Sequence, residues 1–225
     1  MKNYVAGLVV PLLLAASNAR AEVVAQDDDS FVTRDTAVVA TDPKATWLAL
    51  ISPGKWWNSA HTWSGDAANM TLRPQAGGCF CEKIPEDPTA DRVTLEGSVE
   101  HMRVIQAFPE KVLRMRGGLG PLQSEPADGV LTIVLSEAEE GTRIVWEYVV
   151  GGAMRYEKAV ISKAVDGVMT QQLDGLAALL GRLDKPSVAA EEQEGATGEE
   201  SDAGEAPADG PEPTLEEAID ALVDD

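Results

Sequence analysis

The sequence DPKATWLALI, residues 42–51, opens the part of the chain that sets its architecture. Pro43 suits the first position of a helix, with Asp42 or Thr41 as its cap, and the apolar residues that follow give this helix one buried side. Ser-Pro-Gly at 52–54 ends it. The next segment, residues 55–68, is predicted to be a loop, yet it holds Trp56, Trp57 and Trp63. So many aromatic residues in a loop predict either a lid over the core or one wall of a pocket.

A run of strand-like segments surrounds this helix and loop. Before them, residues 30–33 and 37–40 are rich in β-branched and small apolar residues, with a possible break between. After them, turn residues separate further strand candidates, which lie at 69–74, 79–84, 92–105, 112–116, 129–136 and 142–150. Short consecutive strands joined by turns indicate an antiparallel sheet.

One long amphipathic segment follows the strands, at residues 154–183. Its apolar positions recur every three or four residues and define one face, formed by Ile161, Val165, Met169, Leu173, Leu176, Leu180 and Leu183. Gly167, Gly175 and Gly181 interrupt this helix and indicate a kink or a close approach to another element. The predicted fold class is therefore α+β, a curved antiparallel sheet around a long C-terminal helix.

The N-terminus predicts export. Lys2 precedes an apolar run at 5–16 that is too short to span a bilayer, and Ala19-Arg20-Ala21 fits a signal cleavage site. We expect residues 1–21 to be a signal peptide cut after Ala21, which predicts a periplasmic or secreted protein. No later segment is long and apolar enough to span a membrane once this signal is removed.

The C-terminal end is strongly acidic. Residues 189–225 hold fourteen Asp or Glu and no Lys or Arg, so they carry most of the net charge of −20. Such a composition predicts a disordered acidic linker at 187–213 after a domain at 22–186. Leu215, Ile219 and Leu222 then predict a short amphipathic helix at 214–225, a possible site for a protein partner. The charge balance excludes nucleic acid as a partner, because that role requires a basic face.

The order of several short motifs resembles one known superfamily across residues 30–183. These motifs are Asp42-Pro43 with Trp47 and Leu50, Trp56-Trp57, Gly77-Gly78 before Cys79-Phe80-Cys81-Glu82, FPEKVL at 108–113, GLGPL at 118–122, Gly141-Thr142-Arg143 and YVVGG at 148–152. The chain resembles START-like proteins, also called SRPBCC, helix-grip or Bet v 1-like proteins. Within them it is most similar to bacterial activator-of-Hsp90-ATPase-like and polyketide cyclase/dehydrase-like proteins.

The resemblance implies a sheet wrapped around the last helix, with a hydrophobic cavity between them. Members bind lipids, sterols, polyketides and other apolar molecules, and only some are enzymes. No catalytic residue set is common to the superfamily, so none is transferred. Export argues against Hsp90 activation, because Hsp90 and ATP are not expected outside the cytoplasm.

The candidate cavity residues come from the tryptophan-rich loop, the glycine-rich segment at 117–120, the strands and the apolar helix face. They are Trp56, Trp57, Trp63, Leu113, Met115, Leu119, Trp146, Tyr148, Val165 and Met169. For any single one of them we favour simple core packing, since a domain of this size needs an apolar core in any case.

Two histidines and two cysteines are the remaining candidates for chemistry. His101, in a predicted strand, and His61, in the tryptophan-rich loop, are weak candidates for a general acid or base, and each can instead be a satisfied or exposed histidine. Cys79 and Cys81 lie two apart on a strand, which favours buried, reduced thiols. A redox pair and a metal site are the alternatives. We predict no cofactor and no metal.

The favoured function is binding or transport of a small apolar molecule. An enzyme of the cyclase or dehydratase type acting in the same cavity, and an interaction module that uses the C-terminal helix, are the two alternatives.

Overall fold

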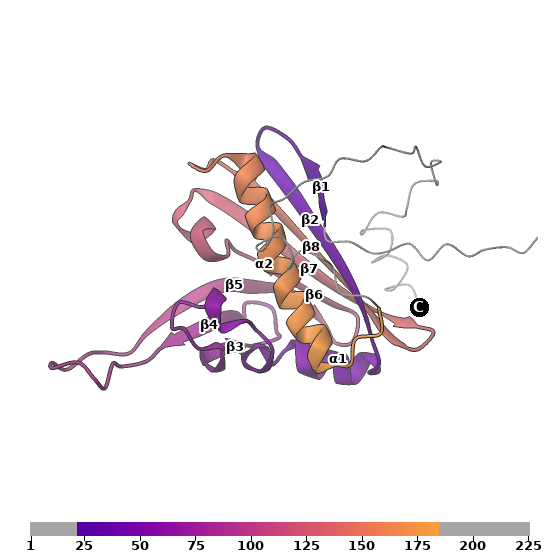
Figure 1. The fold of residues 1–225 in the computed structure, drawn as a ribbon, viewed down its shortest axis with the longest axis horizontal. Helices are drawn as coiled ribbons and strands as arrows, with labels where there is room; N and C mark the ends of the chain where they lie inside the picture. The colour runs from indigo at the N-terminus through magenta and orange to yellow at the C-terminus, as the bar shows by residue number, and fades with distance from the viewer. Residues whose placement is uncertain (1–21, 185–225) are drawn as a thin grey trace, which may run out of the picture.

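The computed structural model describes residues 22–184, which form an eight-stranded antiparallel sheet and two α-helices (Figure 1). The strands lie in the order β1-β2-β8-β7-β6-β5-β4-β3. Their bounds are β1 Glu22–Gln26, β2 Ser30–Val39, β3 Met70–Leu72, β4 Cys79–Ile84, β5 Gly97–Phe108, β6 Val112–Arg116, β7 Ala127–Ala138 and β8 Gly141–Gly152. The helices are α1 Pro43–Leu50 and α2 Lys158–Leu179, with short 3₁₀ helices η1 Pro53–Lys55, η2 Ser59–His61, η3 Ala67–Asn69 and η4 Gly120–Ser124.

Helix α1 forms where its proline and its capping residue predict it. Pro43 is its first residue, and the Asp42 carboxylate accepts a hydrogen bond from the Ala45 N–H at 2.7 Å. Trp47 and Leu50 are its buried apolar side chains. The predicted helix and its Asp42 cap are confirmed.

The longest pairing joins β7 and β8, in register from Ala127–Gly152 to Ala138–Gly141. The turn of this hairpin lies between the strands predicted at 129–136 and 142–150. Gly141 has a φ of 104°, and a Cβ there would lie 2.0 Å from the Val39 carbonyl oxygen, so only glycine fits this turn. Alternate residues of β8 face the core, as predicted, and Ile144, Trp146, Tyr148 and Val150 are all buried.

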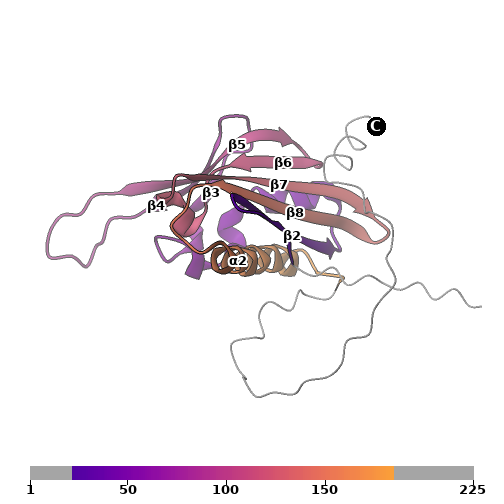
Figure 2. The same ribbon diagram turned by 90° about the horizontal axis from the view of Figure 1, so that it is seen from above.

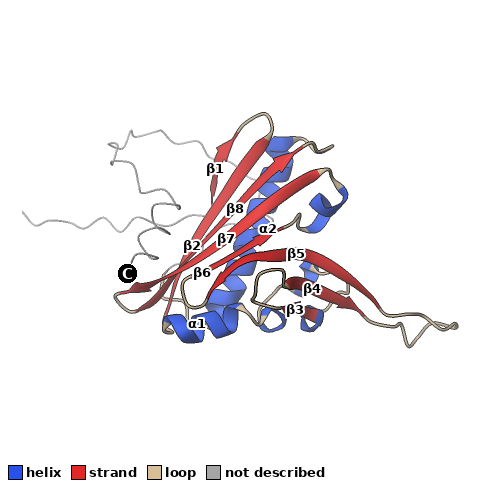
Figure 3. Cartoon of the chain, turned by 180° about the vertical axis from the view of Figure 1, so that it is seen from behind, coloured by secondary structure: helices blue, strands red, loops and turns tan. Residues whose placement is uncertain are grey.

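Both helices lie on one face of the curved sheet (Figure 2). Helix α2 crosses that face diagonally, and the view from behind shows the strands in front of it (Figure 3). Ile161, Met169, Leu173 and Leu176 are buried between helix and sheet, which confirms the apolar face. Leu183 is the exception, because the helix ends at Leu179 and leaves this side chain 47% exposed.

Three strands differ from the prediction. Residues 30–39 form one strand without a break, because β2 pairs continuously with β8 from Ser30 to Val39. The strand predicted at 92–105 runs instead from Gly97 to Phe108. Strand β1 was not predicted, and it is held by its pairing with β2. In each case the pairing with a neighbouring strand of the sheet sets the bounds of the strand.

The cysteine prediction is wrong. Cys79 and Cys81 form a disulfide, and neither is buried. Their side chains share one face of β4, while Phe80 and Glu82 point to the opposite, buried face. The two Cα atoms are 5.3 Å apart, closer than the roughly 6.6 Å spanned by two extended residues. The strand is therefore contracted here, opposite an irregularity in the pairing of β4 with β5, which brings the two thiols within bonding reach.

Within residues 22–184, no helix combines the length and apolar character needed to cross a bilayer. The predicted signal peptide, acidic linker and C-terminal helix lie outside the described residues.

Candidate functional site

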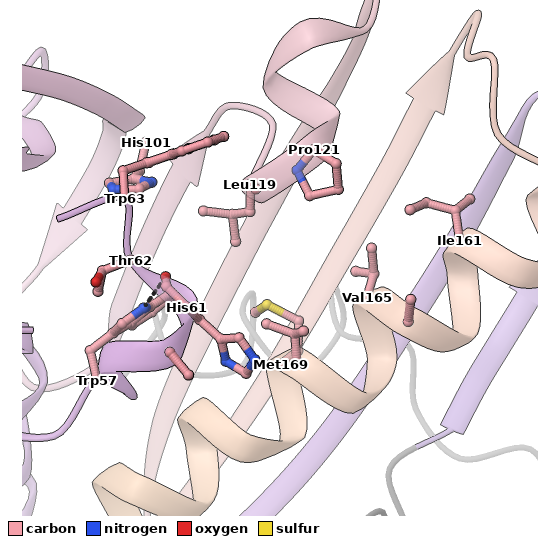
Figure 4. A pocket seen from close by; sticks show the side chains of 14 residues that line it. Trp57, His61, Thr62, Trp63, His101, Leu119, Pro121, Ile161, Val165 and Met169 are labelled. Carbon is pink, nitrogen blue, oxygen red and sulfur yellow. Dashed lines mark hydrogen bonds between the residues drawn. The ribbon is translucent and has the colours of Figure 1, made fainter. Parts of the chain in front are cut away.

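A pocket of about 370 Å³ opens between α2, the tryptophan-rich loop and the glycine-rich segment after β6 (Figure 4). The loop contributes Trp57 and residues 60–63, and the segment 119–121 forms the opposite rim. Helix α2 supplies one wall with Ile161, Ala164, Val165, Val168 and Met169, and His101 reaches the pocket from β5. This volume lies at the lower end of the range of about 300–1,000 Å³ that is usual for small-molecule sites.

The lining is almost entirely apolar. None of the lining residues is Asp, Glu, Lys or Arg. Its polar side-chain groups are those of His61, Thr62 and His101 and the indole N–H groups of two tryptophans. Such a lining suits a ligand bound mainly by burial of apolar surface, with few directional contacts.

Five of the ten predicted cavity residues line this pocket, together with both histidines. These five are Trp57, Trp63, Leu119, Val165 and Met169. They come from the loop, the glycine-rich rim and the helix face, so three segments far apart in the sequence meet here.

The other five predicted cavity residues lie in the packed core. Trp56, Leu113, Met115 and Trp146 surround a residual void of only about 10 Å³ beneath the helices. The reason is the direct packing of the loop on the sheet, which brings the rings of Trp56 and Trp146 to 5.9 Å between centroids. The centre of the sheet is therefore filled by the protein itself, and the open space lies toward its β4–β5 side.

Tyr148 is the last of these five core residues, and its hydroxyl contacts the glycine-rich segment that forms one rim of the pocket. Its hydroxyl donates to the Gly117 carbonyl at 2.9 Å and accepts from the Leu119 N–H at 3.2 Å. A buried tyrosine thus holds the glycine-rich segment in place, and burial raises the pKa of its hydroxyl. The hydroxyl remains protonated and acts as a structural contact.

Gln172 fastens the tryptophan-rich loop to α2. Its side chain is fully buried and accepts a hydrogen bond from the Asn58 N–H at 2.8 Å. Its amide nitrogen lies 3.2 Å from the Val168 carbonyl oxygen and 2.6 Å from His61 Nδ1. This residue was missed from the sequence, although a glutamine among the apolar positions of the predicted helix is a detectable signal.

Glu82 fastens the other end of the loop. This buried carboxylate accepts hydrogen bonds from the backbone N–H groups of Trp63 at 3.0 Å and Ser64 at 2.5 Å. His101 Nε2 lies 2.9 Å from the same carboxylate. Burial alone would raise the pKa of Glu82, but the hydrogen bonds from Ser64, Trp63 and His101 outweigh it and lower the pKa. The carboxylate is therefore held ionised, as an acceptor only.

A β-bulge places His101 in this network. Phe80 pairs with Met102 and Cys81 pairs with Glu100, so His101 is an extra residue in β5. His101 and Met102 are consequently both buried, although they are neighbours in a strand. Bulges commonly re-aim one side chain in this way. The ring of His101 then packs 5.5 Å from that of Phe80.

Gln123 closes the network at the pocket mouth. Its carbonyl oxygen accepts from the Trp63 indole N–H at 3.0 Å, and its amide nitrogen lies 3.3 Å from the Glu100 carbonyl oxygen and 3.5 Å from His101 Nδ1. Trp63, which is 59% exposed, is thereby tied to the opposite rim. Both nitrogens of His101 are engaged, which matches the structural alternative for this residue better than a general base.

No protein-family model and no curated protein sequence matches this chain. Solved structures do resemble it. An uncharacterised protein of Rhizobium leguminosarum is 16% identical with a TM-score of 0.49, over 68% of this chain and 95% of that one. Protein MLL2253 of Mesorhizobium loti is 19% identical with a TM-score of 0.45, over 66% and 96%. CalU16 of Micromonospora echinospora is 15% identical with a TM-score of 0.41, over 67% and 73%. Likenesses at this level support no statement about family or activity.

Proposed function

We propose that the chain is an exported carrier or binding protein whose domain, of the helix-grip type, holds a small apolar molecule in the pocket beside α2. The observation that carries this proposal is the pocket itself, an uncharged hollow of about 370 Å³ in a domain whose centre is otherwise filled. Burial of apolar ligand surface there would contribute about 25 cal/mol for each Å² removed from water.

Two further observations support it. The arrangement of a curved antiparallel sheet with a C-terminal helix across one face is the one that the resemblance to START-like proteins implies. The N-terminal pattern of a positive residue, an apolar run and a small-x-small site supports export to the periplasm or beyond.

An enzyme acting in the same pocket is the second candidate, and the position of His61 is the observation that favours it. A general acid or base needs a titratable group that faces the ligand. His61 is partly exposed on the pocket wall, whereas His101 is engaged at both nitrogens.

A pocket-filling substitution tests the binding proposal. Ala164 lies on an exposed part of α2 and lines the pocket, so Ala164→Trp can occupy the pocket without entering the core. We expect it to weaken binding of the neutral fluorophore phenylnaphthylamine at least about tenfold, which corresponds to about 1.4 kcal/mol. Fluorescence titration measures this.

The matched control is Ala178→Trp, at an exposed position of the same helix outside the pocket lining. It is expected to bind the fluorophore as the wild-type protein does. Equal binding by both variants would show that the fluorophore binds elsewhere, and an absence of binding by the wild-type protein would refute the proposal.

A further inference from the structure

The pocket lining contains five side chains that carry a hydrogen-bond donor, and four of them already donate to other parts of the protein. Trp57 Nε1 donates to the His61 carbonyl at 3.1 Å, and Trp63 Nε1 donates to Gln123 at 3.0 Å. The Thr62 hydroxyl donates to the Ser59 carbonyl at 2.7 Å, and His101 donates to the Glu82 carboxylate at 2.9 Å. The fifth side chain is His61.

The neighbouring Gln172 determines which nitrogen of His61 carries the proton. A backbone N–H can only donate, so the contact with Asn58 N identifies the oxygen of the Gln172 amide. A backbone carbonyl can only accept, so the contact with Val168 O identifies the amide nitrogen. That nitrogen faces His61 Nδ1 at 2.6 Å and can only donate to it.

His61 Nδ1 is therefore an acceptor, and the neutral ring carries its proton on Nε2. Burial lowers the pKa of His61, which favours this neutral form. Figure 4 shows the ring directed toward α2 beside Met169. Within residues 22–184, no hydrogen bond engages Nε2. The pocket thus presents one oriented N–H donor among apolar side chains.

The absence of charged residues from the lining limits the kinds of ligand that the pocket can bind. A charged ligand in this apolar space would lose its hydration without gaining a partner of opposite charge, since none of the lining residues is Lys, Arg, Asp or Glu. An uncharged ligand with an oxygen acceptor would instead satisfy the free donor.

We infer that the ligand is an uncharged, largely apolar molecule with a hydrogen-bond acceptor, such as a ketone, ester or ether oxygen, which receives the Nε2–H of His61. This inference rests on the proposed function, because it assumes that the pocket binds an apolar molecule. It assigns His61 the role of a specificity residue.

Three matched probes test the inference by displacement of phenylnaphthylamine. Acetylnaphthalene and ethylnaphthalene have nearly the same shape and differ in one carbonyl oxygen, and naphthoate adds a negative charge. His61→Phe keeps an aromatic ring of similar size but removes the donor. We expect this variant to bind acetylnaphthalene about tenfold more weakly and ethylnaphthalene within twofold of the wild-type protein. Naphthoate should bind the wild-type protein at least about tenfold more weakly than acetylnaphthalene.

Val165→Ala is the control for a general change of the lining, and it should weaken both neutral probes alike. Equal effects of His61→Phe on both probes would overturn the role of His61, and tight binding of naphthoate would overturn the uncharged ligand. Failure of both neutral probes to bind the wild-type protein would refute the proposed function instead. If His61→Phe does not fold, nitrogen NMR of the wild-type protein tests the role of His61. Acetylnaphthalene should then shift the signal of the His61 Nε2–H group, and ethylnaphthalene should not.

Discussion

At the scale of single residues, two buried carboxylates on the inner face of the sheet differ in their partners. Glu82 is fully satisfied by two backbone N–H groups and His101. Asp35 in β2 is 4% exposed and accepts at Oδ1 from the Thr36 N–H at 2.7 Å. Its Oδ2 has no hydrogen-bond partner in the described part of the chain. Burial therefore dominates at Asp35 and raises its pKa from 3.8 to about 6.

The raised pKa predicts how Asp35 affects stability. The folded state binds this proton more tightly than the unfolded state, so the stability contributed by Asp35 is present below pH 4 and is lost as pH rises through about 6. Asp35→Asn keeps the group neutral at all pH values. We expect the variant to be more stable than the wild-type protein at pH 8, by up to about 3 kcal/mol, and similar to it near pH 4.

Urea unfolding of both proteins across this pH range measures the difference. Asp91→Asn is the matched control, because it makes the same change at an exposed position. It should follow the pH dependence of the wild-type protein. A constant difference between Asp35→Asn and the wild-type protein at all pH values would contradict the assignment.

The residues of the pocket were only partly predictable from the sequence. Alternation along the strands predicts which side chains face inward, as for Trp146 and Met115, but it does not say whether they meet a cavity or another side chain. That outcome depends on how closely the Trp56 loop packs on the sheet. The partners of His61 are likewise set by Gln172, which lies 111 residues away in the chain.

At the scale of elements, predictions succeed where the signals are local. The cap and proline of α1, the two strands of the β7–β8 hairpin, and the apolar periodicity of α2 each follow from local signals, and each is confirmed. Strand β1 and the bulge at His101 depend on pairing with another strand. The position of the bulge therefore could not be read from the local sequence, whereas β1 lies only a short turn before its partner β2.

Substitution by alanine is expected to have opposite effects on stability at the two glycines inside α2. A Cβ at Gly175 would lie 2.4 Å from the Trp56 carbonyl oxygen, so this glycine permits close contact between the helix and the loop. A Cβ at Gly167 would meet no atom within 4 Å. We expect Gly167→Ala to stabilise the protein by up to about 1 kcal/mol through helix propensity.

Gly175→Ala should destabilise the protein by about 1–3 kcal/mol, because a helix or loop shift must relieve the overlap. Thermal and urea unfolding of the pair measure both effects, and each variant serves as the control for the other. Stabilisation by both substitutions would show that α2 does not approach the loop this closely.

At the scale of the whole molecule, the helices of the described residues cover one face of the sheet and leave its other face uncovered (Figure 3). The covered face is filled near Trp146 and open beside His61, so residues 22–184 combine a packed core with an apolar pocket at the edge of that core. Two tethers hold the pocket wall in place, Gln172 on α2 and Glu82 on β4. This division between a packed centre and a tethered rim makes the proposed apolar binding site compatible with a stable domain.

Native mass spectrometry of the protein purified without detergent from the compartment in which it resides tests the binding site most directly. The account predicts an added mass from one small, uncharged molecule on the wild-type protein and its loss in Ala164→Trp, while Ala178→Trp retains it. Wild-type protein that carries no added mass and takes up no neutral apolar probe on titration would contradict the account.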